Sequence, residues 1–374
     1  MNKIEFIDLK AQRSFLGSKI DDAISRVLTH GGYIMGPEVK AFESQLAEFS
    51  SADRAVSCSN GTDALSLALM ALGVSEGDAV FVPSFTFAAT AEVVALTGAT
   101  PVFVEIQADT FNMDPARLTQ AVNEVIAKGE LTPRAVIAVD LFGQIADYPE
   151  LKSIADSFGL KLIADAAQGL GATLDGKQAI EWADVVTTSF FPAKPLGCYG
   201  DGGAVLTHDA DLAAMMESLR VHGKGSDKYD NVRIGMNCRL DTIQAAILIE
   251  KLAIFSDEIA KRNAVANRYS ESLKQVVKVP YVMPGAVSTW AHYTLVVENR
   301  DEVQKQLKEK GVPSAVYYPK PLHQQTAYKS FPVSGGQLPI SEQLSGQVLS
   351  LPMHPYMERD VQDYIIEGVK AVIR

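Results

Sequence analysis

The sequence predicts an α/β protein, with a large domain built on a central, mostly parallel sheet flanked by helices and a smaller C-terminal α/β domain. Between residues 54 and 207, short apolar runs alternate with segments of helical character. Several of these runs are apolar at successive positions, which is typical of strands buried on both faces in a parallel sheet. The 374 residues, 47% of them hydrophobic, suffice for one large core and one smaller core.

The strands of the large sheet are expected at the apolar runs. These runs are RAVSCSN, DAVFVPSFTF, ATPVFVEI, RAVIAVDLFG, LKLIADAA, DVVTTSF and GGAVLTH. The segment DALSLALMALG lies between the first two runs and ends on Gly73, as helices often do. The alternation therefore predicts helices that connect parallel strands.

The pattern changes after the sheet region. We expect a long helix over 240–277, a strand over 288–299, a polar helix over 300–311, a second strand over 312–319 and a closing amphipathic helix over 357–374. We place the domain boundary near 250, with the N-terminal segment and large domain in 1–250 and the small domain in 251–374. The N-terminal segment is expected to pack against the small domain or a partner subunit.

Charge and cysteine content exclude several classes of protein. The net charge is −11 and the pI about 5.1, so an overall basic footprint for nucleic acid is absent. Cys58, Cys198 and Cys238 are too scattered for a disulfide framework or a CxxC metal pair, and we expect reduced thiols. The start lacks a signal-peptide core, and no run approaches the ~20 apolar residues of a membrane span. We therefore expect a cytoplasmic protein with neither nucleic-acid nor membrane partners.

Common catalytic fingerprints are missing from the sequence. GCYGDGG matches neither GxxxxGK(S/T) nor GxGxxG, and neither HExxH nor GxSxG occurs. The six histidines are dispersed, so no metal site is expected. Hydrolase, kinase and NAD-dependent functions all lose support.

The stretch SCSNGTDALSLAL predicts a strand, a tight turn and then a helix. Free backbone N–H groups and the positive end of the helix dipole make such a turn a phosphate site. Gly61 permits close approach and the Thr62 hydroxyl adds a donor. The alternative is that Asn60 or Thr62 simply caps the helix.

Two further stretches place ring-binding candidates after strands. In PSFTFAAT, Phe87 lies just past a buried strand, where ligands collect in open α/β sheets, although packing in the core is the simpler interpretation. In LKLIADAAQG, Asp165 closes an apolar strand, and a buried carboxylate there needs a partner such as a protonated ring nitrogen. Gln168 follows at helical spacing and can reach the same ligand. For Asp165 the alternative is a helix cap.

Lys194 lies in SFFPAKPLGCYGDGG, a turn-forming segment with little charge around it. Confinement in a partly apolar site disfavours the ammonium form and lowers the pKa, as a Schiff-base lysine requires. A lysine that snorkels from a loop is the alternative. Together, the phosphate cradle, ring stacker, pyridinium partner and lysine are the parts of a pyridoxal phosphate (PLP) site.

The chain resembles the fold-type I, PLP-dependent sugar aminotransferases of the DegT/DnrJ/StrS family. The matching stretches are FIDLKAQ, GGYIMGPEVKAFE, SNGTDAL, PSFTFAAT, ADAAQGLGA, SFFPAKPLGCYGDGGA, GMNCRLDTIQAAIL, YYPKPLH and LSLPMHP. They run nearly from end to end, so the resemblance covers both predicted domains.

The resemblance implies a role for each matching residue. Lys194 would bind the cofactor covalently and later move the proton, and Asp165 would keep the pyridine nitrogen protonated. Phe87 would stack on the ring, and Gln168 would bond near the ring oxygen. The phosphate would be held by Gly61, Thr62 and Ser189, and by Asn237 from the neighbouring subunit. The resemblance thus implies a homodimer with shared active sites, inactive as a monomer.

Within the family, the chain is most similar to aminotransferases of UDP-2-acetamido-2-deoxy-3-oxo-D-glucuronate. These enzymes use L-glutamate to aminate C3 during synthesis of surface polysaccharide, including O-antigen of lipopolysaccharide. This chain has Ala193 where relatives often have serine, and Tyr317 where some have histidine. These departures put local phosphate and sugar contacts in question.

Five residues are candidates for binding the substrate: Tyr33, Met35, Arg239, Tyr318 and His323. Arg239 and His323 are candidates for a carboxylate or diphosphate, because arginine binds either group bidentately. For Arg239 an intersubunit salt bridge is the alternative, and for Tyr318 core packing is nearly as good an interpretation. Tyr33 and Met35 would touch the nucleotide from the other subunit.

Three other functions remain in view. The first is amination of another 3- or 4-keto nucleotide sugar, including dTDP- or UDP-deoxysugars. The second is a sugar dehydratase, in which histidine replaces the lysine, and Lys194 argues against it. The third is a non-catalytic regulatory protein on the same fold, which the set of Lys194, Asp165 and Thr62 disfavours.

Overall fold

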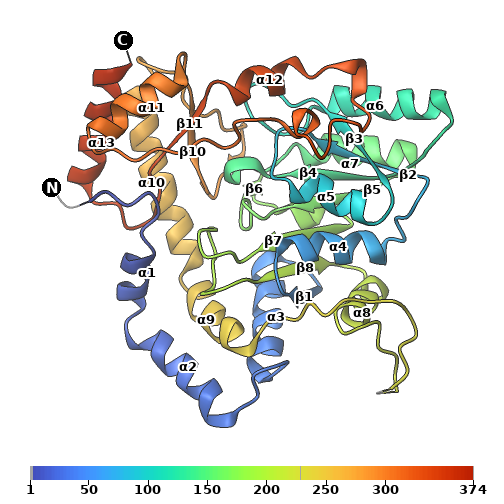
Figure 1. Cartoon of the computed structure of the whole chain (residues 1–374). Helices are drawn as coiled ribbons and strands as arrows, with labels where there is room; N and C mark the ends of the chain where they lie inside the picture. Colours follow the sequence, from blue (N-terminus) through green and yellow to red (C-terminus); the bar gives the residue numbers. More distant parts are fainter. Residues whose placement is uncertain (1–2, 228, 374) are drawn as a thin grey trace.

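The computed structural model describes residues 3–227 and 229–373 and shows a central sheet with helices on both faces (Figure 1). The seven-stranded sheet has the order β1-β8-β7-β5-β4-β2-β3. Its strands are β1 (Arg54–Cys58), β2 (Asp78–Pro83), β3 (Thr100–Val104), β4 (Thr132–Val139), β5 (Lys161–Asp165), β7 (Val185–Ser189) and β8 (Gly203–Thr207). All neighbours pair in parallel except β8, which is antiparallel to β1 and β7. The predicted α/β class is confirmed.

Both faces of the sheet are buried. The covering helices are α3 (Pro37–Ser50), α4 (Gly61–Ala71), α5 (Ala89–Leu96), α6 (Pro115–Lys128), α7 (Tyr148–Phe158), α8 (Ala210–Leu219) and α9 (Thr242–Leu252). Helices α3, α6, α7 and α9 share one core with Phe81 and Leu162, whereas α4, α5 and α8 share the other with Val80 and Ile163. Successive strand residues thus enter opposite cores, which is why the strands read as continuous apolar runs.

A second, smaller layer is built from the C-terminal part of the chain. It contains α10 (Phe255–Leu273), β10 (Tyr293–Val296), α11 (Arg300–Glu309), β11 (Val348–Leu351) and α13 (Arg359–Val372), with β10 and β11 antiparallel. Their shared core includes Tyr269, Leu349 and, from the N-terminal segment, Ile4. The N-terminal segment is tied down further where Met353 N donates to Phe6 O at 3.1 Å.

The chain does not divide cleanly at one residue. Residues Leu322, Tyr328 and Leu338 return to the core of the large sheet, beneath α4 and α5. A division at residue 250 therefore stays a prediction. Short elements complete the chain: α1 (Leu9–Leu16), α2 (Ser18–His30), α12 (Pro339–Ser345), and the paired β6 (Thr173–Leu174) and β9 (Ala286–Val287).

Two predicted elements differ in the structure. The helix expected over 240–277 is divided into α9 and α10 around Ile254, whose φ of −111° and ψ of 0° leave the helical region. The break lets α9 pack on the large domain while α10 joins the small core. The strand expected over 312–319 forms only an isolated bridge, Ala315 to Ser350, and Pro313 and Pro319 provide no N–H for a ladder. Arg374, the end of the predicted closing helix, lies outside the described residues.

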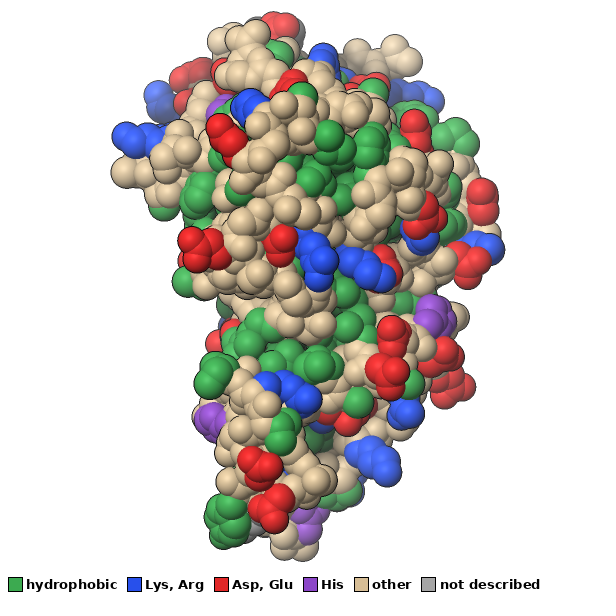
Figure 2. Space-filling view, turned by 90° about the vertical axis from the view of Figure 1, so that its right-hand side faces the viewer, with side chains coloured by type: hydrophobic (Ala, Val, Ile, Leu, Met, Phe, Trp, Pro, Cys, Tyr) green, Lys and Arg blue, Asp and Glu red, His purple; other side chains and the backbone are tan. Residues whose placement is uncertain are grey.

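The surface in Figure 2 carries acidic and basic side chains interspersed, with hydrophobic ones gathered at the middle of the upper half and at mid-height. No continuous basic area covers this face. Within 3–227 and 229–373, no helix combines the length and apolar character that crossing a bilayer requires.

Candidate active site

The predicted site residues converge on one edge of the sheet. Asp165 ends β5, Lys194 follows the end of β7, and Phe87 follows the end of β2. These three strands belong to the parallel part of the sheet, so their carboxyl ends lie along the same edge. Residues far apart in the sequence are thereby placed along one edge of the sheet.

The N-terminus of α4 opens onto this edge next to β7. Asn60 caps the helix, because its Oδ1 accepts a hydrogen bond from Asp63 N at 2.8 Å. The backbone N–H groups of Gly61 and Thr62 donate to no acceptor in the described part of the chain. A Cβ on Gly61 would lie 2.7 Å from Ser189 Cβ, so only glycine fits here without displacement. Two free N–H groups, a helix dipole and the nearby Ser189 hydroxyl fit a phosphate group.

Asp165 and the half-buried Lys194 carry opposite charges that act on each other's pKa. Asp165 is buried, and its carboxylate accepts from Ala167 N at 3.1 Å and from Thr90 Oγ1 at 3.4 Å. Burial raises the pKa of Asp165, against the hydrogen bond from Ala167 and the charge of Lys194. Burial likewise lowers the pKa of Lys194, against the charge of Asp165. The charge of Lys194 offsets only part of the cost of burying the Asp165 carboxylate. A protonated ring nitrogen bound beside this carboxylate would offset more of that cost.

The structure bears on the alternatives for both charged residues. A turn over 167–171 follows β5 where a helix would begin, and Asp165 Oδ1 accepts from Ala167 N at its start, so Asp165 caps this turn and no long helix. Lys194 is half-buried with a lowered pKa, which does not suit an ammonium that reaches freely into solvent. Its backbone N–H donates to Phe191 O at 2.8 Å, which fixes the turn that presents the amine.

Phe87, Tyr318 and Gln168 form an aromatic and amide group near the same sheet edge. Phe87 is 57% exposed, so the core-packing alternative is wrong, and its ring centroid lies 6.4 Å from that of Tyr318. Gln168 is buried, accepts from Phe142 N at 2.8 Å and donates to Tyr318 Oη at 3.2 Å. The amide of Gln168 thus holds Tyr318 in place within this group.

Tyr33, Met35 and Asn237 are the residues expected to act across subunits. Arg239, a candidate for binding the substrate carboxylate or diphosphate, follows two residues after Asn237. The Tyr33 carbonyl accepts from Thr242 N at 3.0 Å, and Arg239 donates to Asn237 Oδ1 at 2.6 Å. Tyr33 is 49% exposed and Met35 40% exposed. No hydrogen bond or ring contact among the described residues links this group to Lys194, so the roles of its members stay predictions.

His323 has a closed environment. Its Nδ1 is 2.6 Å from Ser84 Oγ and its Nε2 is 3.0 Å from Glu342 Oε1. Both ring nitrogens are thus engaged between the end of β2 and α12. A substrate-binding role for His323 stays a prediction, and it requires one of these contacts to break.

Sequence reasoning missed His292. Its ring stacks on Tyr317 at 4.3 Å between centroids, and its buried Nδ1 has no hydrogen-bond partner in the described chain. Burial lowers the pKa of His292 to about 3, and the charge of Lys194 lowers it further. The neutral imidazole therefore lies near Lys194. No motif marks it, because it sits inside an ordinary apolar strand pattern.

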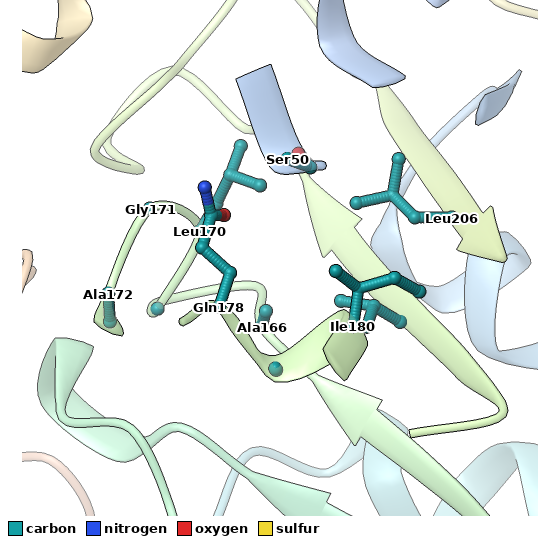
Figure 3. A pocket seen from close by; sticks show the side chains of 11 residues that line it. Ser50, Ala166, Leu170, Gly171, Ala172, Gln178, Ile180 and Leu206 are labelled. Carbon is teal, nitrogen blue, oxygen red and sulfur yellow. The ribbon is translucent and has the colours of Figure 1, made fainter. Parts of the chain in front are cut away.

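A small cavity lies beneath α3, beside the turn that follows Asp165 (Figure 3). Its volume is about 10 Å³, and Ser50, Ala166, Leu170, Ile180 and Leu206 are among its lining residues. Ser50 Oγ is buried there without a partner. The space suits one water molecule and no substrate. In the described chain, no three metal-ligating side chains gather into a metal site.

Comparison with known proteins identifies the family. The profile of the DegT/DnrJ/EryC1/StrS aminotransferase family matches residues 15–370. The UDP-2-acetamido-2-deoxy-3-oxo-D-glucuronate aminotransferase of Pseudomonas aeruginosa is 49% identical over 358 residues, 95% of this chain and 96% of that protein. A crystal structure of a DegT/DnrJ/EryC1/StrS aminotransferase from Brucella abortus has 52% identity and a TM-score of 0.98, over 99% of both chains.

A third relative was solved with a cofactor. The NtdA structure from Bacillus subtilis contains bound pyridoxamine phosphate (PMP) and is 29% identical, with a TM-score of 0.89 over 100% of this chain and 86% of that chain. The free N–H groups at Gly61 and the Asp165–Lys194 pair fit such a cofactor. This chain belongs to the DegT/DnrJ/EryC1/StrS aminotransferase family and is a PLP-dependent aminotransferase.

Proposed function

We propose that the enzyme transfers the amino group of L-glutamate to the C3 ketone of UDP-2-acetamido-2-deoxy-3-oxo-D-glucuronate. The observation that carries the amination chemistry is the meeting of Asp165 and Lys194 at one buried edge of the sheet. The similarity to the Pseudomonas aeruginosa enzyme supports this keto sugar. The amino sugar would serve surface polysaccharide such as the O-antigen of lipopolysaccharide, and the reaction would take place in the cytoplasm.

Each cofactor-binding residue has a separate task. The cofactor, when bound, supplies an electron sink for the carbon that loses or gains the amino group. The N–H groups of Gly61 and Thr62 and the hydroxyl of Ser189 bind its phosphate. The Asp165 carboxylate keeps the ring nitrogen protonated. Phe87 covers one face of the ring, and Gln168 is positioned near the ring oxygen.

Lys194 is the catalytic base as well as the attachment point of the cofactor. Burial lowers its pKa, so a larger fraction of the amine is neutral and nucleophilic near neutral pH. The same amine removes the α-proton of glutamate and returns a proton to the sugar carbon in the second half of the reaction. Because 2-oxoglutarate leaves before the sugar binds, the kinetics are ping-pong.

The active site is completed by a second copy of the chain. Tyr33, Met35 and Ile34 form an exposed apolar loop, and Phe87 and Phe191 are more than half exposed at the site itself. Contact between two copies would bury such apolar side chains. Asn237 of one subunit then reaches the cofactor phosphate bound by the other, and a monomer lacks activity.

Substrate residues follow from the same arrangement. Arg239 binds the carboxylate or the diphosphate of the sugar nucleotide, unless it is used in a salt bridge between subunits. Tyr318 faces the sugar, because Gln168 holds its hydroxyl near the sheet edge that carries Asp165. Tyr33 and Met35 touch the nucleotide across the dimer.

The experiment is an amination assay with a panel of keto sugar nucleotides and L-glutamate. We expect the highest kcat/KM with the UDP-linked 3-keto uronate, and a dimer by light scattering. Activity confined to a dTDP-deoxysugar would overturn the substrate and leave the reaction type standing. Absence of any amination, with no cofactor band in the visible spectrum, would overturn the function itself.

A further inference from the structure

The loop over residues 190–202 presents Lys194 at the sheet edge. It is closed at its base, where Cys198 N donates to Phe190 O at 2.8 Å. A Cβ on Gly197 would lie 2.4 Å from Pro192 O, so the loop also folds tightly on itself. The position of the Lys194 amine therefore depends on how firmly this loop is held.

Helix α9 lies against the loop and contributes a buried lysine to it. Lys251 is 1% exposed, and its Nζ donates to Gly197 O at 2.6 Å. The same ammonium lies 4.1 Å from the centroid of the Tyr199 ring. Gln244, also on α9, accepts from Tyr199 N at 2.8 Å. Two side chains of one rigid helix thus hold the segment just beyond Lys194.

The charge of Lys251 is costly where it lies. Burial lowers its pKa to about 8, against the opposing charge of Glu258, which forms no salt bridge with it. A buried ammonium is expensive to desolvate, so its hydrogen bond and ring contact must offset that cost. What the ammonium offers here, and a methionine would not, is the bond to Gly197 O and the cation–π contact with Tyr199.

We propose that Lys251 is a positioning residue that fixes the loop carrying Lys194, through the Gly197 carbonyl and the Tyr199 ring. The proposal rests on the proposed role of Lys194 as attachment point and base. Lys251 itself does not touch the substrate or the cofactor. Its effect is to hold the amine of Lys194 in register with Asp165.

The test compares Lys251→Met with Lys261→Met in the full-length dimer. Lys261 is the matched control, because it is an exposed lysine whose Nζ lies 4.9 Å from the centroid of the Phe15 ring, away from the loop. Amide hydrogen exchange is measured in the cofactor-free protein, so the readout does not depend on catalysis. We expect exchange over residues 194–200 to accelerate about tenfold or more in Lys251→Met and to be unchanged in Lys261→Met.

The holoenzyme provides a second readout. In Lys251→Met, we expect kcat to fall about tenfold with little change in KM for glutamate, and the pH midpoint of the cofactor's absorption change to shift. If Lys251→Met does not fold, Tyr199→Leu removes the ring alone and should accelerate exchange over the same residues by a smaller factor. Unchanged exchange in a folded Lys251→Met or Tyr199→Leu variant overturns the proposal.

The result is separable from the test of Lys194 itself. Should Lys194→Ala retain transamination, the proposed function fails while the exchange measurement still reports on the loop. If amide exchange accelerates in Lys251→Met while kcat is unaltered, Lys251 stabilises the loop, but its proposed role in positioning Lys194 is overturned.

Discussion

The two halves of the proposed site differ in how completely one chain builds them. The cofactor half, formed by Gly61, Asp165, Ser189 and Lys194, lies along one sheet edge. The partner half, formed by Tyr33, Met35, Asn237 and Arg239, lies near the start of α9, with Tyr33 and Met35 exposed. Elements of a single domain position the first half, whereas loops with no link to Lys194 carry the second.

The contrast separates the functions that would need a second copy from those that would not. In the proposed enzyme, proton removal from glutamate would depend chiefly on the sheet edge, and recognition of the sugar nucleotide on surfaces brought together by association. Substitutions in the cofactor half should therefore damage both half-reactions. In the partner half, substitutions of Tyr33, Met35 and Arg239 should damage mainly the sugar step, whereas those of Asn237 should damage both through the phosphate.

The largest effect is expected for Lys194→Ala. Loss of the amine removes both covalent attachment and proton transfer, so glutamate turnover should fall about 10³-fold or more. Stopped-flow spectra of the glutamate half-reaction measure this loss. The surface variant Lys152→Ala, which only breaks an exposed pair with Asp156, should be fully active. Retained turnover in Lys194→Ala would sink the mechanism.

The second-largest effect on turnover is expected for Asp165→Asn. The amide keeps the shape but loses the negative charge that holds the ring nitrogen protonated, so kcat should fall on the order of 10²-fold in both half-reactions. Single-turnover rates with glutamate and with the keto sugar measure the two losses. A decrease in rate that is confined to the sugar step would contradict the role of Asp165 as partner of the ring nitrogen, which serves both half-reactions.

Gly61→Ala tests the phosphate cradle. A Cβ at this position would lie 2.7 Å from Ser189 Cβ, so one element must shift and the phosphate should bind about tenfold or more weakly. Equilibrium dialysis of PLP against the cofactor-free protein gives the dissociation constant. Gly346→Ala is the matched control, because its Cβ would lie 3.5 Å from Gln343 O, an ordinary contact. Equal affinity in both variants argues against phosphate at α4.

Mixing two variants with complementary defects tests whether the halves come from different subunits. Arg239→Ala should raise KM for the sugar nucleotide about tenfold and leave the glutamate half-reaction intact. When the sugar nucleotide is far below its KM, refolding an equal mixture with Lys194→Ala should give roughly one quarter of wild-type activity, because half the dimers then hold one complete site. No recovery from a mixture that forms dimers would place both halves in one chain.

The smallest effect concerns stability in acid. Burial lowers the pKa of His292 to about 3 and that of His354 to about 4, below the ordinary value near 6.5. Because the unfolded chain binds these protons first, stability is fully present above pH 6.5 and declines as pH falls, by at most about 1.4 kcal/mol per unit for each histidine. Thermal unfolding of His292→Gln should show a shallower decline with falling pH than wild type, whereas the exposed His222→Gln should decline as wild type does.

From the sequence the sheet and most helices could be predicted, and residues for the cofactor half could be proposed. Strands buried on both faces must be apolar throughout, and the turn after β1 needs a glycine close to Ser189. Both features can therefore be predicted from short stretches of the sequence. The sequence also suggested Asp165 and Lys194, because a carboxylate and an amine in apolar strand-end segments need partners. The sequence did not exclude the alternatives, because an aspartate can also cap a helix and a lysine can also extend from a loop into solvent.

Only the tertiary structure decided what depends on distant contacts. The break between α9 and α10 follows from two separate cores, which no local pattern in the helix reveals. The neutral state of His292 and the closed environment of His323 come from partners contributed by other elements. The bond from Lys251 to Gly197 is likewise invisible in the sequence, where a lysine in an amphipathic helix reads as solvent-exposed. Burial and charge compensation are properties of the packed chain, so they could not be read before the fold was known.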